Sequence, residues 1–391
     1  MLRQYQVVIL GDEGPEAESL KTQLALKFAE LQIEPELLRF ESLEGISTLD
    51  RRAPVVGVYF AFDAPPADID RHLEPLLADG HVVIPVVRDL NTVNDVAPVS
   101  LRPTNAFELA ADDPEFIRLS DVVLENLSLL RRTRRLFISY RRAESRRVAI
   151  HLYEELDLRT FDVFLDTHSI RPGEPFQEVL WHRLADTDVM VLLDSPGFLN
   201  SRWTEEELAR ANSTSLQILQ VIWPDHPQAA YSAFSQAHQL SAADFVDIGV
   251  TLGPDCRLTD EAVKVIAREA ESLRARALAA RHAYLVQEMF REAAAVGATI
   301  TAQPGRYLKL ETPDGQKAII VPTVGVPDAV RYQEIEEDLS AEDTNDLILV
   351  FDERGIRDRW LKHLRWLNPN MKVRSLAIGE VKGWMGRRIG A

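Results

Sequence analysis

The chain has 391 residues, 46% of them hydrophobic and 27% charged, so it can form two or three globular domains with apolar cores. Its formal net charge of −17 argues against bulk binding to nucleic acid or to an anionic membrane. No run of about 18 apolar residues predicts a membrane span, and no signal-peptide core follows Met1. The single cysteine, Cys256, excludes an intrachain disulfide and a cysteine-cluster metal site, and we expect a cytoplasmic protein.

Residues 1–130 alternate short apolar runs with amphipathic stretches, which predicts βαβ units and a parallel sheet. We expect a Rossmann-like α/β domain, with strands at 7–10, 36–40, 55–62 and 81–87, and helices at 17–31, 69–77 and 114–130. This segment carries 23 acidic and 10 basic side chains, and eight arginines follow within residues 131–147. The arginines could steer an anionic ligand or pair with the acidic neighbour, and the sequence leaves both possibilities open.

A second alternation of strands and helices predicts a flavodoxin-like domain over residues 131–280. Its expected strands lie at 136–139, 163–165, 189–193 and 218–222, with 245–248 as a candidate fifth, and its helices at 144–158, 176–184, 204–211 and 261–280. The helical pattern continues to residue 295 and leads into a small α+β or α/β domain at 281–391. There we expect a hairpin (306–311 and 318–321), strands at 347–351 and 373–377, and a helix at 360–366.

Polar loops follow the first three strands of the central domain, at the edge where open parallel sheets bind ligands. They are residues 139–142, 166–173 and 194–197. Trp203 and Glu207 come next and share one face at helical spacing. A carboxylate beside an indole suits a ribosyl site, because it can stabilise the positive charge that develops as an N-glycosidic bond breaks.

Arg141 and Arg142 add guanidinium groups that match the oxygens of a pyrophosphate. Plainer interpretations also fit these residues. Glu205, Glu206 and Glu207 can form an ordinary acidic first turn of a helix, and Trp203 can be a core residue.

Taken together, four blocks of sequence resemble a Toll/interleukin-1 receptor (TIR) domain in their order and approximate spacing. The blocks are LFISYRR at 136–142, DVFLD at 162–166 with a Pro-Gly pair at 172–173, VLLDSPGFL at 191–199, and SRWTEEEL at 201–208. The resemblance covers roughly residues 134–280. It is strongest to the NAD-consuming branch, which includes bacterial TIR proteins, because of the Ser-Tyr-Arg-Arg ending and the Trp-x-x-x-Glu spacing.

The resemblance implies Glu207 as the catalytic carboxylate, with Glu206 as an alternative one residue away. It implies that Phe137, Ser139, Tyr140, Arg141, Arg142 and Trp203 border the NAD pocket. Asp166, Arg171 and Gly173 match a loop that contacts a neighbouring TIR domain, and family active sites are often completed across two protomers. We therefore count these three with the substrate site.

The implied activity is cleavage of the nicotinamide–ribose bond of NAD, giving nicotinamide and ADP-ribose or a cyclic product. NAD is the substrate, no metal or cofactor is implied, and activity depends on self-association. The implied setting is bacterial anti-phage defence, with the outer domains responding to a trigger ligand or partner protein. Two alternatives stay open: a non-enzymatic TIR scaffold, and a TIR effector gated by a nucleotide signal.

Overall fold

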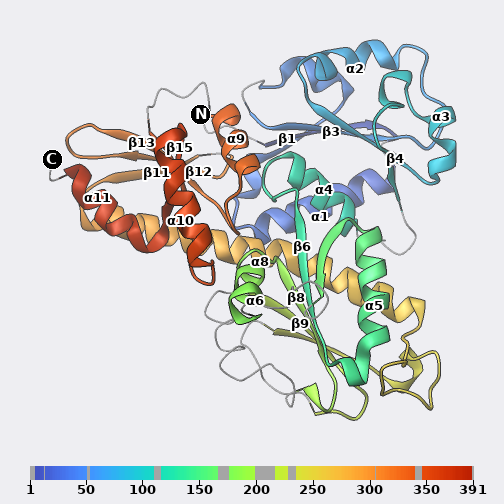
Figure 1. The fold of residues 1–391 in the computed structure, drawn as a ribbon. Helices are drawn as coiled ribbons and strands as arrows, with labels where there is room; N and C mark the ends of the chain where they lie inside the picture. The colour runs from blue at the N-terminus through green and yellow to red at the C-terminus, as the bar shows by residue number, and fades with distance from the viewer. Residues whose placement is uncertain are drawn as a thin grey trace. The chain divides into compact units, whose positions relative to one another are not determined.

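The computed structural model describes residues 5–12, 14–50, 53–109, 116–165, 176–198, 216–227, 235–303, 305–339 and 346–389. Within these residues the chain forms three five-stranded sheets (Figure 1). It divides into two compact units, Met1–Arg132 with Gln303–Arg306, and Thr133–Ala302 with Tyr307–Ala391. The expected α/β fold class, with a flavodoxin-like centre flanked by α/β domains, is confirmed. A further division of the second unit near residue 280 stays a prediction.

The N-terminal sheet is parallel and has the strand order β2-β1-β3-β4-β5. Its central strands are apolar and buried, as expected when helices cover both faces of a sheet. The predicted helix at 114–130 is too long at its end. Helix α4 ends at Asn126, and Ser128 then turns the chain with a φ of 59°. The bounds are β1 (Tyr5–Gly11), α1 (Pro15–Glu30), β2 (Leu38–Glu41), β3 (Val55–Phe60), α2 (Ile69–Ala78), β4 (Val82–Val87), α3 (Val93–Val96), β5 (Phe107–Glu108) and α4 (Ile117–Asn126).

The central sheet is also parallel, and its order β10-β9-β8-β6-β7 is the flavodoxin-like one. One apolar cluster joins the sheet to α5 and α8, and a second joins its other face to α6. The bounds are β6 (Arg134–Ser139), α5 (Arg142–Leu158), β7 (Phe161–Leu165), α6 (Phe176–Ala185), β8 (Val189–Asp194), β9 (Gln217–Ile222), β10 (Ser235–Gln239) and α8 (Asp260–Ala295).

The predicted fifth strand at 245–248 is wrong. Phe245 forms only an isolated bridge with Leu258, and Val246 and Ile248 are both 66% exposed. The fifth strand is β10, whose sequence Ser-Gln-Ala-His-Gln lies at the edge of the sheet and has no apolar run. An edge strand that is partly exposed does not need one.

The C-terminal sheet has the order β11-β12-β13-β14-β15. The predicted hairpin is confirmed as the antiparallel pair β12–β13, and β13, β14 and β15 run parallel. One apolar cluster contains residues of α8 and α11, and another contains residues of α9 and α10. The bounds are β11 (Thr299–Gln303), β12 (Tyr307–Glu311), β13 (Lys317–Pro322), α9 (Ala329–Asp338), β14 (Leu347–Phe351), α10 (Asp358–Leu367), β15 (Val373–Ala377) and α11 (Val381–Ile389).

Helix α8 packs against both sheets of the second unit (Figure 1). Its 36 residues span about 54 Å, with Ile266 in the core of the central sheet and Leu285 in the core of the C-terminal sheet. Between them, Arg281 donates to the carbonyl oxygens of Ala185 and Thr187 at the corner between α6 and β8. The same helix therefore ties the C-terminal sheet to that corner. No helix of the described residues is long and apolar enough to cross a membrane.

Candidate active site at the carboxyl edge of the central sheet

Strands β6 and β8 are adjacent and parallel, so their carboxyl ends lie at the same edge of the central sheet. Strand β6 ends at Ser139, Tyr140 and Arg141 follow it, and α5 begins at Arg142. Ligands of doubly wound folds bind at such an edge, where the strand order reverses on either side of the first strand. The described part of the predicted site therefore occupies the expected place.

Three residues form a polar bracket at this edge: Arg141, Glu144 and Gly197. The Arg141 guanidinium pairs with Oε1 of Glu144, and Oε2 of Glu144 accepts the Gly197 backbone N–H at 2.9 Å. The Glu144 side chain is only 13% exposed, so this carboxylate bridges two loops in a partly dehydrated setting. A methyl group at Gly197 would collide with both side chains, which explains why a glycine stands there.

The first turn of α5 holds Glu144 in place. The Arg141 carbonyl accepts the backbone N–H groups of Glu144 and Ser145, each at 3.0 Å, and the Ser145 hydroxyl at 3.2 Å. Ser145 departs from helical geometry, with φ −146° and ψ 22°, so the turn is kinked. The Glu144 carbonyl also accepts the Gly253 N–H at 3.0 Å and the Cys256 thiol at 3.3 Å.

Cys256 is a structural residue in this arrangement. Burial raises the pKa of its thiol to about 11, so it stays protonated and unreactive near neutral pH. Its contact with the Glu144 carbonyl fastens the loop at 253–256 against α5.

Two buried hydroxyls lie beside the bracket without a hydrogen-bond partner among the described residues. Ser139 ends β6 and Ser195 follows β8, and both are fully buried. A buried polar group normally has a partner, and an orphan at a strand end points to a ligand or to another segment of chain. The two hydroxyls could therefore face a bound molecule with several hydroxyl or phosphate oxygens.

Asp194 forms a second polar centre at the end of β8. It is fully buried, and its Oδ2 accepts the Gln220 amide at 2.8 Å. Nε2 of His226 lies 3.5 Å from Oδ1 of Asp194. This carboxylate is held by the neighbouring strand β9 and by the loop that follows it.

The other described site residues lie in two environments. Phe137 is fully buried and stacks on Phe164 with ring centroids 5.4 Å apart. Tyr140 is also buried and belongs to the core cluster shared with α5 and α8. Arg142 is exposed at the start of α5. Ser139 and Arg141 lie at the carboxyl edge of the sheet, whereas the rings of Phe137 and Tyr140 belong to the apolar core.

The remaining predicted residues, Asp166, Arg171, Gly173, Trp203, Glu206 and Glu207, lie outside the described residues. Their place in the chain still carries information. The segment with Trp203 and Glu207 connects Asp194, the last residue of β8, to Gln217, the first of β9. Strand β8, which precedes this segment in the chain, ends at the edge that carries the bracket.

The sequence did not single out Glu144 or His226 as site residues. A signal for Glu144 was present, because Arg141 and Glu144 are three residues apart at a helix start, where such pairs form. Nothing in the sequence marks His226. It lies close to Asp194 only because β8 and β9 are neighbours in the sheet.

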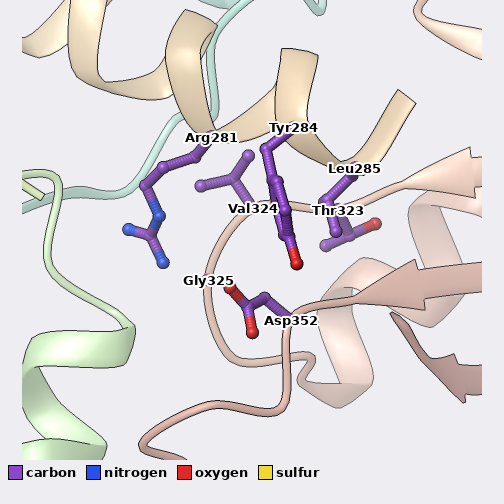
Figure 2. Close-up of a pocket in the computed structure, with 7 residues that line it drawn as sticks. All are labelled: Arg281, Tyr284, Leu285, Thr323, Val324, Gly325 and Asp352. Carbon is purple, nitrogen blue, oxygen red and sulfur yellow. The ribbon is translucent and has the colours of Figure 1, made fainter. Parts of the chain in front are cut away.

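A separate shallow pocket lies in the C-terminal part of the second unit (Figure 2). Its polar wall is formed by Tyr284 of α8, Thr323 after β13 and Asp352 after β14. Asp352 already pairs with Arg354, whose guanidinium lies 4.8 Å from the centre of the Tyr284 ring. The enclosed part of this pocket has room for little more than a water molecule, so it is too small to hold a dinucleotide.

No group of three or more metal-ligating side chains occurs among the described residues.

Residues 136–248 match the family model for the TIR domain, so the chain contains a TIR domain built on its central sheet. The TIR resemblance is thereby confirmed, and the NAD-consuming branch stays a prediction. No curated protein matches the chain. The matching solved structures include a candidate phosphosugar isomerase from Silicibacter pomeroyi, with 9% identity over 70% of this chain and 86% of that chain. Its TM-score is 0.21, so it gives no information on the fold or chemistry here.

Proposed function

We propose that the TIR domain cleaves NAD between nicotinamide and ribose, with Glu207 as the catalytic carboxylate. The products are nicotinamide and ADP-ribose, or a cyclic ADP-ribose when an internal nucleophile takes the place of water. NAD is the substrate, and the reaction uses no metal or other cofactor.

The observation that carries the proposal is the pair of orphaned hydroxyls, Ser139 and Ser195, beside the bracket. Both are buried at the carboxyl edge of β6 and β8, and neither has a partner among the described residues. A nucleotide bound there could supply hydroxyl and phosphate oxygens to them. Glu207 follows β8 in the chain, and β8 ends at this edge of the sheet.

In the proposed reaction the bond between ribose C1′ and nicotinamide N1 breaks. Its electron pair goes to the pyridinium ring, which leaves as neutral nicotinamide. The ribose gains oxocarbenium character in the transition state, and the ionised Glu207 stabilises that charge. A water oxygen then bonds to C1′ and releases a proton, so one NAD and one water give nicotinamide, ADP-ribose and a proton.

The test is nicotinamide release from NAD by the full chain, measured over a range of protein concentrations with product identification. Glu207→Ala should lose activity at least about a hundredfold, since charge-stabilising groups in enzymes are worth about that much. Glu205→Ala is the matched control, because it removes a carboxylate from the same acidic run. Circular dichroism checks that each variant is folded.

The outcomes separate the assignments. Loss in Glu206→Ala with retention in Glu207→Ala would move the catalytic role to Glu206. Retention in both would remove this site from the reaction. A steep rise in specific activity with protein concentration would support activation by self-association, and a constant specific activity would contradict it.

A non-enzymatic TIR scaffold is the second candidate, and one observation favours it. The Arg141 guanidinium is already paired with Glu144, and the rings of Phe137 and Tyr140 lie in the core. Fewer described side chains are then left to hold a dinucleotide. Oligomers of the purified chain with no NAD loss at any concentration would establish the scaffold and overturn the enzyme.

The proposed setting is NAD depletion in bacterial anti-phage defence, with the flanking domains responding to a trigger ligand or partner protein. Expression in bacterial cells should lower NAD and halt growth when the trigger is present, and Glu207→Ala should not. For the nucleotide-gated alternative, the small volume of the pocket at Tyr284 counts against a cyclic dinucleotide there.

A further inference from the structure

The end of the chain reverses the charge of the rest. Residues 354–391 carry ten basic and two acidic side chains, a local charge of +8, whereas the whole chain carries −17. The net charge argued against bulk binding to nucleic acid, but it averages over regions of opposite sign. A local basic surface can bind a polyanion whatever the total charge of the chain.

Three basic side chains of α10 lie on one face around an exposed indole, whereas the fourth, Arg365, pairs with Glu380. Arg359, Lys362, His363 and Trp366 are spaced by three, four and seven residues, so they are neighbours on the helix surface. All four are exposed, and Trp366 is 67% exposed. We call these four residues the α10 outer face. Neither Arg359 nor Lys362 has an ion-pair partner among the described residues.

Three rings form a ladder along this helix. The centroids of Trp360 and His363 are 5.5 Å apart, and those of His363 and Trp366 are 6.0 Å apart with an interplanar angle of 19°. The inner end is fixed, because the Trp360 indole donates to the Pro327 carbonyl at 3.2 Å and packs on the core. The Trp366 ring is thus exposed to solvent at the outer end of a ladder whose inner end, Trp360, is fixed in the core.

We propose that the α10 outer face binds single-stranded nucleic acid. An unpaired base would stack on the Trp366 indole, and Arg359 and Lys362 would contact the flanking phosphates. Aromatic stacking combined with a basic track is the common way to bind single strands without sequence preference. This site is separate from the TIR edge and does not depend on NAD cleavage.

The same features disfavour two other polyanions. A duplex buries the faces of its bases, so it offers Trp366 nothing to stack on. A membrane would need an apolar helix face, but Leu364 is 2% exposed and packs in the core together with Leu361 and Leu367.

The test uses the full chain and fluorescence anisotropy with a labelled thymidine 20-mer, the matched duplex, and vesicles containing anionic lipid. We expect binding to the single strand that is at least tenfold tighter than to the duplex. Trp366→Ala should weaken it by about tenfold or more. The double variant Arg359→Ala with Lys362→Ala should weaken it and flatten its dependence on salt, since two phosphate contacts are lost.

The matched control is Lys382→Ala with Arg387→Ala, which removes two exposed cations from α11. Helix α11 packs with α8, in a different apolar cluster from α10. The control should leave binding unchanged and all variants should melt as the parent does, because the replaced side chains are exposed. Equal losses in control and test variants, no effect of Trp366→Ala, a preference for duplex or vesicles, or no binding at all would each overturn the proposal.

Discussion

The N-terminal and central sheets share one strand order but differ in what lies at the carboxyl edge. Each is parallel with the order 2-1-3-4-5 in chain sequence. In each, a glutamate in the first turn of the first helix pairs with an arginine: Glu16 with Arg88 in one, Glu144 with Arg141 in the other. The Arg88 side chain is 65% exposed, whereas that of Arg141 is 34% exposed. The N-terminal pair is therefore an ordinary surface ion pair, and the central one belongs to a partly buried network.

The comparison shows that the fold alone does not place the chemistry. Strand β1 ends at Gly11, which has a φ of 78° and lies against the Phe60 backbone. Strand β6 instead ends at buried Ser139 and leads into the bracket, and β8, which ends at the same edge, is followed in the chain by the segment with Glu207. The sheet order supplies a place for a ligand, and the loop residues decide whether anything binds there.

The two units also differ in their buried ion pairs, and the largest predicted effect lies in the second. Nε of Arg274 donates to Asp188 at 2.9 Å, and the Arg135 N–H donates to the same carboxylate oxygen at 3.2 Å. Asp188→Ala would leave Arg274, which is 1% exposed, without this carboxylate, so we expect a loss of about 3–5 kcal/mol. Urea unfolding followed by tryptophan fluorescence measures it, because no tryptophan precedes Trp181.

An unchanged fluorescence transition in Asp188→Ala would contradict this prediction. Asp188→Asn is the matched control. It keeps an oxygen acceptor and the volume, so it should lose less.

The N-terminal unit has a buried pair with poorer geometry, and a smaller effect is expected. Nζ of Lys27 lies 3.1 Å from Oδ1 of Asp121, each side chain is 2% exposed, and neither atom makes a well-directed hydrogen bond. Lys27→Met should destabilise this unit by about 3 kcal/mol because the carboxylate stays buried. Lys27→Met with Asp121→Leu should recover most of that. Far-ultraviolet circular dichroism should detect both effects while tryptophan fluorescence does not.

If the double variant is no more stable than Lys27→Met, the loss does not come from the unpaired carboxylate, and the ion pair itself stabilises the N-terminal unit. The proposed difference between the buried ion pairs of the two units would then be wrong.

The two first-turn glutamates give a direct test of the difference between the edges. Glu144→Gln keeps the shape but weakens the hold on Arg141 and Gly197, so a loss of about 1–3 kcal/mol is expected. It should also lower any NAD cleavage, because the bracket supports the proposed site. Glu16→Gln breaks a surface pair and should cost less than about 1 kcal/mol. Similar losses in the two variants, measured by the two unfolding probes above, would mean that the edges are equivalent.

The sequence predicted what burial dictates. Apolar runs located most strands of the three sheets, because a strand covered by helices on both faces must be apolar throughout. It failed where burial is partial. Strand β10 is polar, and β11 lies at the edge of its sheet with three of its five residues exposed. Helix α9 buries only Tyr332 and Ile335.

At the site, local sequence predicted that Ser139 and Arg141 lie at the end of β6, where the structure has them, and their binding role stays a prediction. It could not foresee that Glu144 would bind the Gly197 backbone 53 residues away, because that contact depends on the adjacency of β6 and β8. The orphaned hydroxyls of Ser139 and Ser195 were equally out of reach, since burial of a serine has no local signature.

The smallest predicted effect concerns pH and the pair between β10 and α8. Nδ1 of His238 lies 3.0 Å from the Glu269 carboxylate. This hydrogen bond raises the pKa of His238, burial partly opposes it, and Asp244 adds to the increase. Because the folded pKa is above the unfolded value, the stabilisation is complete below about pH 6.5 and is lost as the pH rises through the folded pKa. Tryptophan-detected urea midpoints between pH 6 and pH 9 should therefore fall more in the parent chain than in His238→Gln.

Glu269→Gln should flatten the profile in the same way, because it removes the partner instead of the titrating group. If both variants keep the slope of the parent, other groups control the pH dependence of the second unit. If only His238→Gln flattens it, the histidine titrates without help from Glu269, and the proposed pair does not contribute to the pH dependence.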